Sequence, residues 1–434
     1  MYERLKGFRD FYPGEMGARR AVIDSMEATA QRYGFREVGT PALERTQLYI
    51  DKSGEDIVDE LYHFTDHGDR DVALTPELTP TIARMVVDRG QALTKPIKWY
   101  STRPFWRYEE PQQARFREFY QVNVDIIGSA DPAADGEVLA YAADALADLG
   151  LTDDDFTFRV SHRDILGGLL ASFGEGVDTR AAIRAVDKSE KIDREEYHDL
   201  LVEAGLSYDQ AEIFDDLLDV AEDELDDLVD FAGTDRVRDA VDNLQAVLGV
   251  AEELDVRDFC SLSLETARGL DYYTGVVFEC FDDTGEVRRA VFGGGRYDEL
   301  IESLGGQPTP AVGVAPGIAP LTLLLQRAGV WPEEEPVTDY YVLQVGDTRP
   351  VAADLTRTLR ARGHVVETDV SGRSFGSQLD YADSINAETV VIVGERDLEN
   401  DEVTVKDMRS GEQVQVPLAE FPGDRDRPTY DDFA

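Results

Sequence analysis

RGLDYYTGVVFE, residues 268–279, is the stretch of this 434-residue sequence on which the fold prediction depends most. It begins with a cation and ends in a run of β-prone residues. Neighbouring residues on a strand face opposite sides of a sheet, so Tyr272 and Tyr273 cannot both pack into one core. A glycine cluster at 293–295 follows and would let the backbone approach a ligand closely. An ordinary strand with an exposed arginine is the alternative, but these features favour a binding site.

A second informative stretch runs from Ile97 to Gly128, where two β-prone runs flank a polar turn at residues 110–113. This pattern predicts a long antiparallel pair whose side chains alternate between two faces. One face of the second strand is apolar. The other carries Phe119, Gln121, Asn123 and Asp125, opposite Arg103, Phe105, Arg107 and Glu109 of the first strand. A solvated face is the alternative, but solvated faces rarely need a phenylalanine amid glutamine and aspartate.

Together these motifs resemble the histidyl-tRNA synthetase family of class II aminoacyl-tRNA synthetases. The resemblance rests on RGLDYYTG at 268–275, GGGRYDELIESLGG at 293–306 and TPAVGVAPG at 309–317, and it extends over nearly the whole chain. It implies an α+β fold, in which an antiparallel-sheet catalytic domain with a helical insertion precedes a C-terminal α/β anticodon-binding domain. The implied activity is ATP-dependent ligation of L-histidine to its tRNA through a histidyl-adenylate. A run at 15–41 resembles the first class II motif, which implies a homodimer.

The resemblance also implies a set of site residues. Arg107 and Arg268 would be catalytic, because they would neutralise charge at the ATP α-phosphate. The ATP-binding residues would be Arg107, Glu109, Arg115, Phe119 and Arg268. The residues that bind histidine would be Glu77, Thr79, Gln121, Asp125, Tyr272 and Tyr273. Mg²⁺ would accompany the phosphates of ATP, and tRNA would be the macromolecular partner.

The sequence departs from the family pattern in its third class II motif. Most members carry a Glu-Arg pair where Ala319 and Pro320 stand here, and that arginine holds ATP. Arg115 or Arg296 is the nearest replacement within the motifs. The missing arginine also supports an alternative function, that of a non-catalytic paralogue such as the regulatory subunit of ATP phosphoribosyltransferase.

Composition excludes several other classes of protein. No apolar run approaches the roughly 20 residues that span a bilayer, and the N-terminus lacks an apolar signal core, so a cytoplasmic enzyme without membrane contact is predicted. Cys260 and Cys280 are too few for a disulfide framework or a cysteine-based zinc site. His63 and His67 flank a predicted turn, and no protein metal site is predicted there.

The charge balance is strongly acidic, with 43 Lys and Arg against 89 Asp and Glu, a net charge of −46. Apolar content of 42% argues against disorder, so a folded protein with an acidic surface is predicted. Such a surface suits a salt-rich cytoplasm, where repulsion is screened. RNA-binding proteins usually carry a basic surface, so composition alone points away from tRNA.

The predicted organisation has four parts. A catalytic domain spans 1–327 with a helical insertion at about 166–257, a linker covers 328–338, an α/β domain covers 339–422, and a polar tail covers 423–434. Within the insertion, apolar residues at helical spacing predict one amphipathic helix from Ile213 to Leu228. In the α/β domain, Arg373 and Arg396 are candidate tRNA contacts.

Overall fold

The computed structural model describes residues 2–53, 55–189, 192–266, 272–285, 290–332 and 338–421. Arg268, residues 333–337 of the predicted linker and the tail 423–434 lie outside these ranges. The chain divides into two compact units, residues 1–332 and 333–434, and each is described by itself.

The N-terminal unit is built on one eight-stranded sheet in the order β1-β5-β6-β11-β10-β9-β7-β8. Its strands are β1 (Arg36–Glu37), β5 (Ile97–Trp106), β6 (Glu118–Ile127), β7 (Phe156–His162), β8 (Cys260–Leu262), β9 (Val276–Asp282), β10 (Phe292–Arg296) and β11 (Ala311–Val314). Pairing is antiparallel except between β1 and β5 and between β7 and β8. The predicted long antiparallel pair is confirmed as β5–β6, with Arg103 opposite Gln121 and Phe105 opposite Phe119.

The two faces of this sheet are covered by different elements. On β6, Val122, Val124 and Ile126 join the main core, to which α1 (Pro13–Arg32), α4 (Pro132–Ala147), α10 (Asp235–Glu253) and α12 (Ile318–Arg327) contribute. Phe105 of β5 belongs to a smaller core with residues of α3 (Thr79–Arg89) and α11 (Leu300–Ser303). The strict alternation of a strand therefore gives β6 an apolar back and leaves its polar face for a site.

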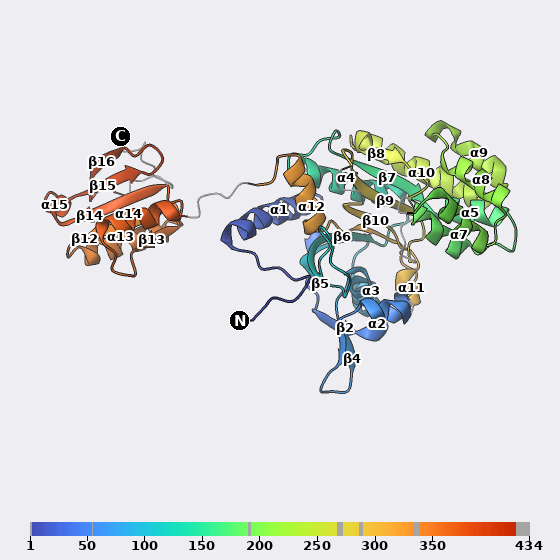
Figure 1. Ribbon diagram of the computed structural model, residues 1–434, viewed down its shortest axis with the longest axis horizontal. Helices are drawn as coiled ribbons and strands as arrows, with labels where there is room; N and C mark the ends of the chain where they lie inside the picture. The colour runs from blue at the N-terminus through green and yellow to red at the C-terminus, as the bar shows by residue number, and fades with distance from the viewer. Residues whose placement is uncertain are drawn as a thin grey trace. The chain divides into compact units, whose positions relative to one another are not determined.

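Several short helices and a small sheet complete the first half of the unit. The turn predicted near His63 and His67 is confirmed as part of a hairpin. β3 (His63–Thr65) and β2 (Leu43–Arg45) both pair antiparallel with β4 (Asp71–Leu74), and Figure 1 shows this sheet projecting from the unit. The remaining short elements are α2 (Thr46–Ser53) and the 3₁₀ turns Glu55–Glu60, Gly90–Ala92, Glu222–Glu224 and Arg257–Phe259. Residues 75–78 connect β4 to α3. The backbone N–H of Trp106 donates to the Thr75 oxygen, which places this connection beside β5 of the large sheet.

The helical insertion lies along one side of the unit (Figure 1). Before α10 it contains α5 (Arg163–Ser172), α6 (Thr179–Val186), α7 (Arg194–Glu203), α8 (Tyr208–Leu218) and α9 (Leu225–Ala232). The prediction of one helix over 213–228 is wrong, because α8 ends at Leu218 and α9 begins at Leu225. The Glu224 side chain accepts a hydrogen bond from the Ala221 backbone N–H at 3.2 Å, and such local capping competes with continued helix.

The C-terminal unit is a five-stranded sheet with helices on both faces. Its strands, in sheet order, are β13 (Val366–Thr368), β12 (Tyr340–Val345), β14 (Thr389–Gly394), β15 (Glu402–Asp407) and β16 (Gln413–Pro417). Its helices are α13 (Arg349–Ala361), α14 (Phe375–Ser384) and α15 (Glu395–Leu398). Residues of α13 and α14 pack into two separate cores, as expected for a central sheet covered on both sides. The predicted α/β character of residues 339–422 is confirmed in the described part of this unit.

Candidate active site

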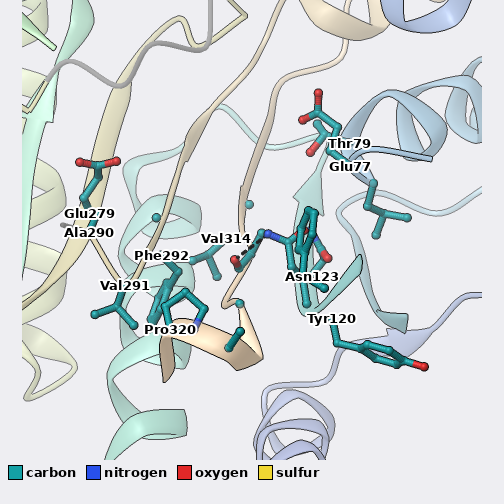
Figure 2. A pocket seen from close by; sticks show the side chains of 18 of the residues that line it. Glu77, Thr79, Tyr120, Asn123, Glu279, Ala290, Val291, Phe292, Val314 and Pro320 are labelled. Carbon is teal, nitrogen blue, oxygen red and sulfur yellow. Dashed lines mark hydrogen bonds between the residues drawn. The ribbon is translucent and has the colours of Figure 1, made fainter. Parts of the chain in front are cut away.

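A cavity of about 390 Å³ opens on the polar face of β6 (Figure 2). Polar and charged side chains line it alongside phenylalanine and tyrosine rings. All the predicted site residues that the structure describes line this cavity: Glu77, Thr79, Arg107, Glu109, Arg115, Phe119, Gln121, Asp125, Tyr272 and Tyr273. Arg268 belongs to the stretch 267–271, outside the described residues. Segments separated by almost 200 residues in the sequence therefore meet at one site.

One region of the cavity is lined by tyrosines and carboxylates. The rings of Tyr272 and Tyr273 lie 4.6 Å apart between centroids, and Tyr272 meets the Tyr297 ring edge-on at 6.1 Å. The expectation that these two tyrosines face opposite sides is wrong, because both precede β9 and pack against the same small core. Gln121 donates to the backbone oxygen of Ala315 at 3.4 Å, which ties its amide to the strand-to-helix connection before α12. Glu77 and Thr79 flank the start of α3 and lie close together in Figure 2. This region combines anionic, hydroxyl and amide groups with aromatic surface.

Asp125 has the most unusual environment of these residues. Its side chain accepts a 2.6 Å hydrogen bond from the Tyr297 hydroxyl, and only 4% of the residue is exposed. Burial raises the pKa of the Asp125 carboxyl to about 7, although the hydrogen bond from Tyr297 favours its charged form. Gly313 of the neighbouring strand is needed here, since a Cβ at that position would lie 2.3 Å from an Asp125 carboxylate oxygen.

The other region of the cavity is built by the connection between β5 and β6. Arg107 donates through Nε to the backbone oxygen of Pro76 at 3.1 Å, and its guanidinium lies 5.3 Å from the centre of the Phe119 ring. Arg115 pairs with Glu109, and that hydrogen bond is the main reason why the pKa of Arg115 is raised. Two cations and an aromatic face therefore lie together, an arrangement that suits a nucleotide with its phosphates.

Comparisons with known proteins agree with this geometry. The sequence model described as "Histidyl-tRNA synthetase" matches residues 7–321, and the one described as "Anticodon binding domain" matches residues 339–423. A histidine–tRNA ligase from Natronomonas pharaonis is 71% identical over the full length of both chains. One from Pyrococcus abyssi is 40% identical over 96% of this chain and 97% of its own. The chain belongs to the histidyl-tRNA synthetase family.

The fold agrees with that membership. The crystal structure of histidyl-tRNA synthetase from Nostoc sp. PCC 7120 superposes with a TM-score of 0.83 at 25% identity, covering 96% of this chain and 97% of the other. The antiparallel-rich sheet with helices and the separate C-terminal α/β unit are consistent with the class II fold that the sequence predicts.

The chain lacks the arginine of the third class II motif, and Arg115 and Arg296 are the two candidate replacements. The surroundings of Arg296 show whether its guanidinium could reach the triphosphate of ATP. Arg296 is 4% exposed and donates to both carboxylate oxygens of Asp135, with Nε at 3.0 Å and 3.2 Å. It also donates to Asp298 and to the backbone oxygen of Ser129. Since this guanidinium is buried in an ion pair, Arg296 is a poor candidate for gripping the triphosphate. Arg115, which lines the cavity, remains the candidate.

Further residues line the cavity of this synthetase that were not assigned a ligand from the sequence. They are Asn123, Glu279, Gly293, Tyr297 and Gly313 among others. Asn123 shares the predicted polar face of β6, so its position carried a usable signal. Glu279 and Tyr297 lie within recognised motifs, but their approach to β6 depends on the sheet order, which spacing alone does not show.

The described part of the chain has neither a ready cluster of metal ligands nor a helix that could span a membrane. There, no group of three or more His, Cys, Asp and Glu side chains is placed to hold a metal ion. No helix in those ranges has the length and apolar character needed to cross a bilayer.

Proposed function

We propose that this protein attaches L-histidine to its tRNA in an ATP-dependent reaction. The single observation that carries the proposal is the shared cavity. It brings a tyrosine- and carboxylate-lined region next to a region with two arginines and a phenylalanine ring. The first suits an amino acid with an imidazole side chain, and the second suits ATP. The non-catalytic alternative is not favoured, because full-length relatives at 67–71% identity are histidine–tRNA ligases.

In the first step, a carboxylate oxygen of histidine attacks the α-phosphorus of ATP. A new P–O bond forms, the bond from that phosphorus to the oxygen bridging to the β-phosphate breaks, and pyrophosphate leaves. No general base is needed, since the carboxylate is already ionised at neutral pH. The protein's task is to reduce repulsion between two anions, and positioned cations do this. We assign this role to Arg107, together with Arg268 from outside the described residues.

Histidine would be held at both of its ends. Glu77 and Thr79 would accept hydrogen bonds from the α-ammonium group, and Gln121 would assist them. Asp125, Tyr272 and Tyr273 would contact the imidazole, whose two nitrogens can donate or accept. A pocket of this kind rejects apolar analogues, because its buried polar groups would be left unpaired. Phe119 would stack against the adenine, and Glu109 and Arg115 would help to hold the phosphates.

Mg²⁺ is a further part of the proposal. The ion usually keeps several waters and needs only one or two protein carboxylates in addition to phosphate oxygens. Glu109 and Glu279 both line the cavity, so the side chains present fit such an ion. When bound, it would neutralise part of the phosphate charge.

In the second step, a 3′-terminal ribose hydroxyl oxygen of tRNA attacks the adenylate carbonyl carbon. A new C–O ester bond forms, the bond from that carbon to the phosphate oxygen breaks, AMP leaves, and the hydroxyl proton is released. The C-terminal unit would bind the anticodon region. Arg373 in this unit lies 4.1 Å from the centre of the Tyr381 ring and donates to Asp369 at 3.0 Å, and Arg396 lies in the short helix α15. These two cations remain our candidate tRNA contacts. We further propose that the protein works as a homodimer in the cytoplasm.

The proposal is tested by exchange of labelled pyrophosphate into ATP. We expect exchange that depends on histidine and is absent with other amino acids. A matched pair of variants, Arg107→Met and Arg20→Met, separates the site from the surface, because Arg20 is exposed and pairs only with Asp24 among the described ion pairs. Loss of a preorganised charged donor lowers rates by roughly 10²–10³-fold. Equal activity of the two variants would contradict the assignment of Arg107.

A further inference from the structure

The connection between β5 and β6, residues 107–117, forms one wall of the cavity. Arg107, Glu109, Ala114, Arg115 and Phe116 all line the site. Ala114 adopts a left-handed φ of 55°, and Gln112 and Arg115 bridge across the turn. We call residues 107–117 the ATP loop. Such an exposed connection needs support from elsewhere if its cations are to stay in place.

That support comes from the N-terminal segment Leu5–Phe11, which lies against the outer side of the ATP loop. The backbone N–H of Arg117 donates to the Gly7 oxygen at 2.8 Å, and Lys6 forms a 2.7 Å ion pair with Glu110. Gly7 has a φ of 86°, and a Cβ there would lie 2.7 Å from the Arg117 side chain and 2.9 Å from Pro111. The approach is close enough that only glycine fits without movement.

Side chains extend this contact into a ladder of alternating rings and cations. The Arg9 guanidinium lies 3.5 Å from the centre of the Phe116 ring and 4.8 Å from that of Phe11. Arg19 of α1 lies 4.4 Å from the Phe11 ring and 3.7 Å from the Tyr120 ring of β6. The ladder therefore runs Phe116–Arg9–Phe11–Arg19–Tyr120. It connects the ATP loop to the rigid sheet through the N-terminal segment.

The two cations of the ladder are stabilised by these rings and by the carboxylate of Glu118, with Glu15 also close to Arg9. Among the described residues, the Nε atoms of Arg9 and Arg19 are buried and have no hydrogen-bond partner. Burial lowers the pKa of Arg9 to about 10, so this side chain still carries its charge at neutral pH. Cation–π contacts become stronger when the cation is removed from water.

Close packing of other side chains does not hold the Phe116 ring on this side. A second cavity of about 480 Å³ lies beside it, and Arg9, Phe11, Arg19, Phe116 and Tyr120 all line that space. Phe116, Tyr120, Ala114 and Ala319 line both cavities. Because there is empty volume next to Phe116, the ring has room to move if its cation is lost. Figure 2 shows that the Tyr120 side chain points away from the other labelled site residues, and Tyr120 also lines the second cavity.

We propose that the segment Leu5–Phe11 is a positioning strap, which sets the ATP affinity of the site by holding the ATP loop through the ring–cation ladder. None of the strap residues 5–11, all of which the structure describes, lines the 390 Å³ cavity. Arg9 and Phe11 are thus positioning residues that act through Phe116. The inference rests on the proposed function, because it assigns ATP to the arginine-lined region. It goes further in naming residues outside the cavity that control ATP and not histidine.

The test compares Arg9→Met with Arg20→Met in the full-length protein. Methionine keeps an apolar stem but removes the cation, and Arg20 is an exposed arginine on α1 that does not contact the ATP loop in the described structure. For Arg9→Met we expect the KM for ATP in the exchange assay to rise roughly tenfold, about 1.4 kcal/mol, which lies between the values for an exposed and a desolvated cation–π contact. The KM for histidine should stay within about twofold, because Arg9 does not line the cavity and, in the described part of the chain, shares no contact with the residues assigned to histidine. Arg20→Met should leave both constants unchanged, and Arg9→Lys should recover part of the ATP affinity.

A second pair of variants tests the ladder itself. Phe11→Leu removes a ring from the middle of the ladder, whereas Phe11→Tyr keeps it. We expect only the leucine variant to raise the KM for ATP. In the double variant Phe11→Leu with Arg9→Met, the increase in the KM for ATP should be smaller than the product of the two single increases, because both changes break the same connection.

Equal increases in both KM values, or an unchanged KM for ATP in folded Arg9→Met, would overturn the strap. Calorimetric titration with ATP alone gives the same comparison without turnover. Absence of exchange in the wild type would overturn the proposed function, while a weaker calorimetric affinity of Arg9→Met would still support the strap.

Discussion

At the scale of the residue, Asp125 is the group whose surroundings most affect how the site would treat histidine. The carboxyl group is buried, accepts from Tyr297 and has a pKa raised to about 7. The free histidine imidazole titrates near a pKa of about 6.5. When both groups are protonated, a cationic imidazolium would face a neutral acid in a buried pocket. That state is unfavourable, whereas an ionised Asp125 still accepts from either form of the ring.

We therefore expect the KM for histidine to rise as pH falls from about 8 to 6, with a smaller change in the KM for ATP. The sign follows from the raised pKa: ionised Asp125 predominates above about 7 and is lost below it. In Asp125→Asn the side chain at position 125 no longer titrates, and of the two groups only the substrate imidazole does. The increase in the KM for histidine at low pH should therefore begin at a lower pH and be less steep. The measurement is exchange kinetics across this pH range. An identical pH profile in wild type and variant would remove Asp125 from the imidazole pocket.

The same residues show how much of the site the sequence could predict. Alternation along β6 placed Gln121, Asn123 and Asp125 on one face without any structure, and the structure places all three on the cavity wall. The alternation pattern did not predict that the Tyr297 hydroxyl would reach Asp125, because that contact depends on β11 lying between β6 and β10 in the sheet. Nor did it predict that Arg296 would be buried against Asp135, since its partner lies 161 residues away.

At the scale of the element, that buried ion pair fixes the end of β10 to the start of α4. The Arg296 and Asp135 side chains are 5% and 0% exposed, and an N-terminal Asp131 cap orients the same helix. Removing one partner of a buried pair leaves the other charge without compensation. The pair therefore determines how the glycine-rich strand β10 meets the helices behind the sheet.

We expect Asp135→Ala to destabilise the N-terminal unit by about 3–5 kcal/mol. Asp24→Ala, which breaks an exposed pair with Arg20, should cost no more than about 1 kcal/mol. Denaturant unfolding at fixed, molar KCl measures both. A small loss for Asp135→Ala would mean that Asp298 and the Ser129 carbonyl are sufficient partners for Arg296.

Whole elements were more predictable than their ends. The sequence predicted the α/β character of the C-terminal unit, because its strands and main helices each have a clear buried face. Apolar periodicity failed at residues 213–228, where Phe214, Leu218, Leu225 and Leu228 keep helical spacing across a break. Periodicity does not register a capping carboxylate such as that of Glu224, which caps the 3₁₀ turn Glu222–Glu224 between the two helices.

At the scale of the whole molecule, the dominant feature is the net charge of −46. Within the described ranges, the acids that are buried are Asp125, Asp135, Asp282 and Asp369, so most of the excess carboxylates face solvent. Their repulsion acts over ~30 Å at ~0.01 M salt but only ~3 Å at ~1 M. Ordinary nucleic-acid binding weakens as salt rises, through loss of counterion release. Here screening of repulsion opposes that loss.

We expect folding, dimerisation and tRNA charging all to improve from ~0.1 M KCl towards molar KCl, because the excess charge makes repulsion dominate. Activity and light-scattering mass across that range measure the effect. A stable, fully active dimer at low salt that added KCl inhibits would contradict the salt-adapted interpretation.

The most direct test of the central claim is transfer of labelled histidine to tRNA by the purified protein in molar KCl. The account predicts acid-precipitable label that requires ATP, histidine and the matching tRNA together, and that Arg107→Met abolishes while Arg20→Met does not. Pyrophosphate exchange without any transfer to tRNA, or charging that survives Arg107→Met unchanged, would contradict it.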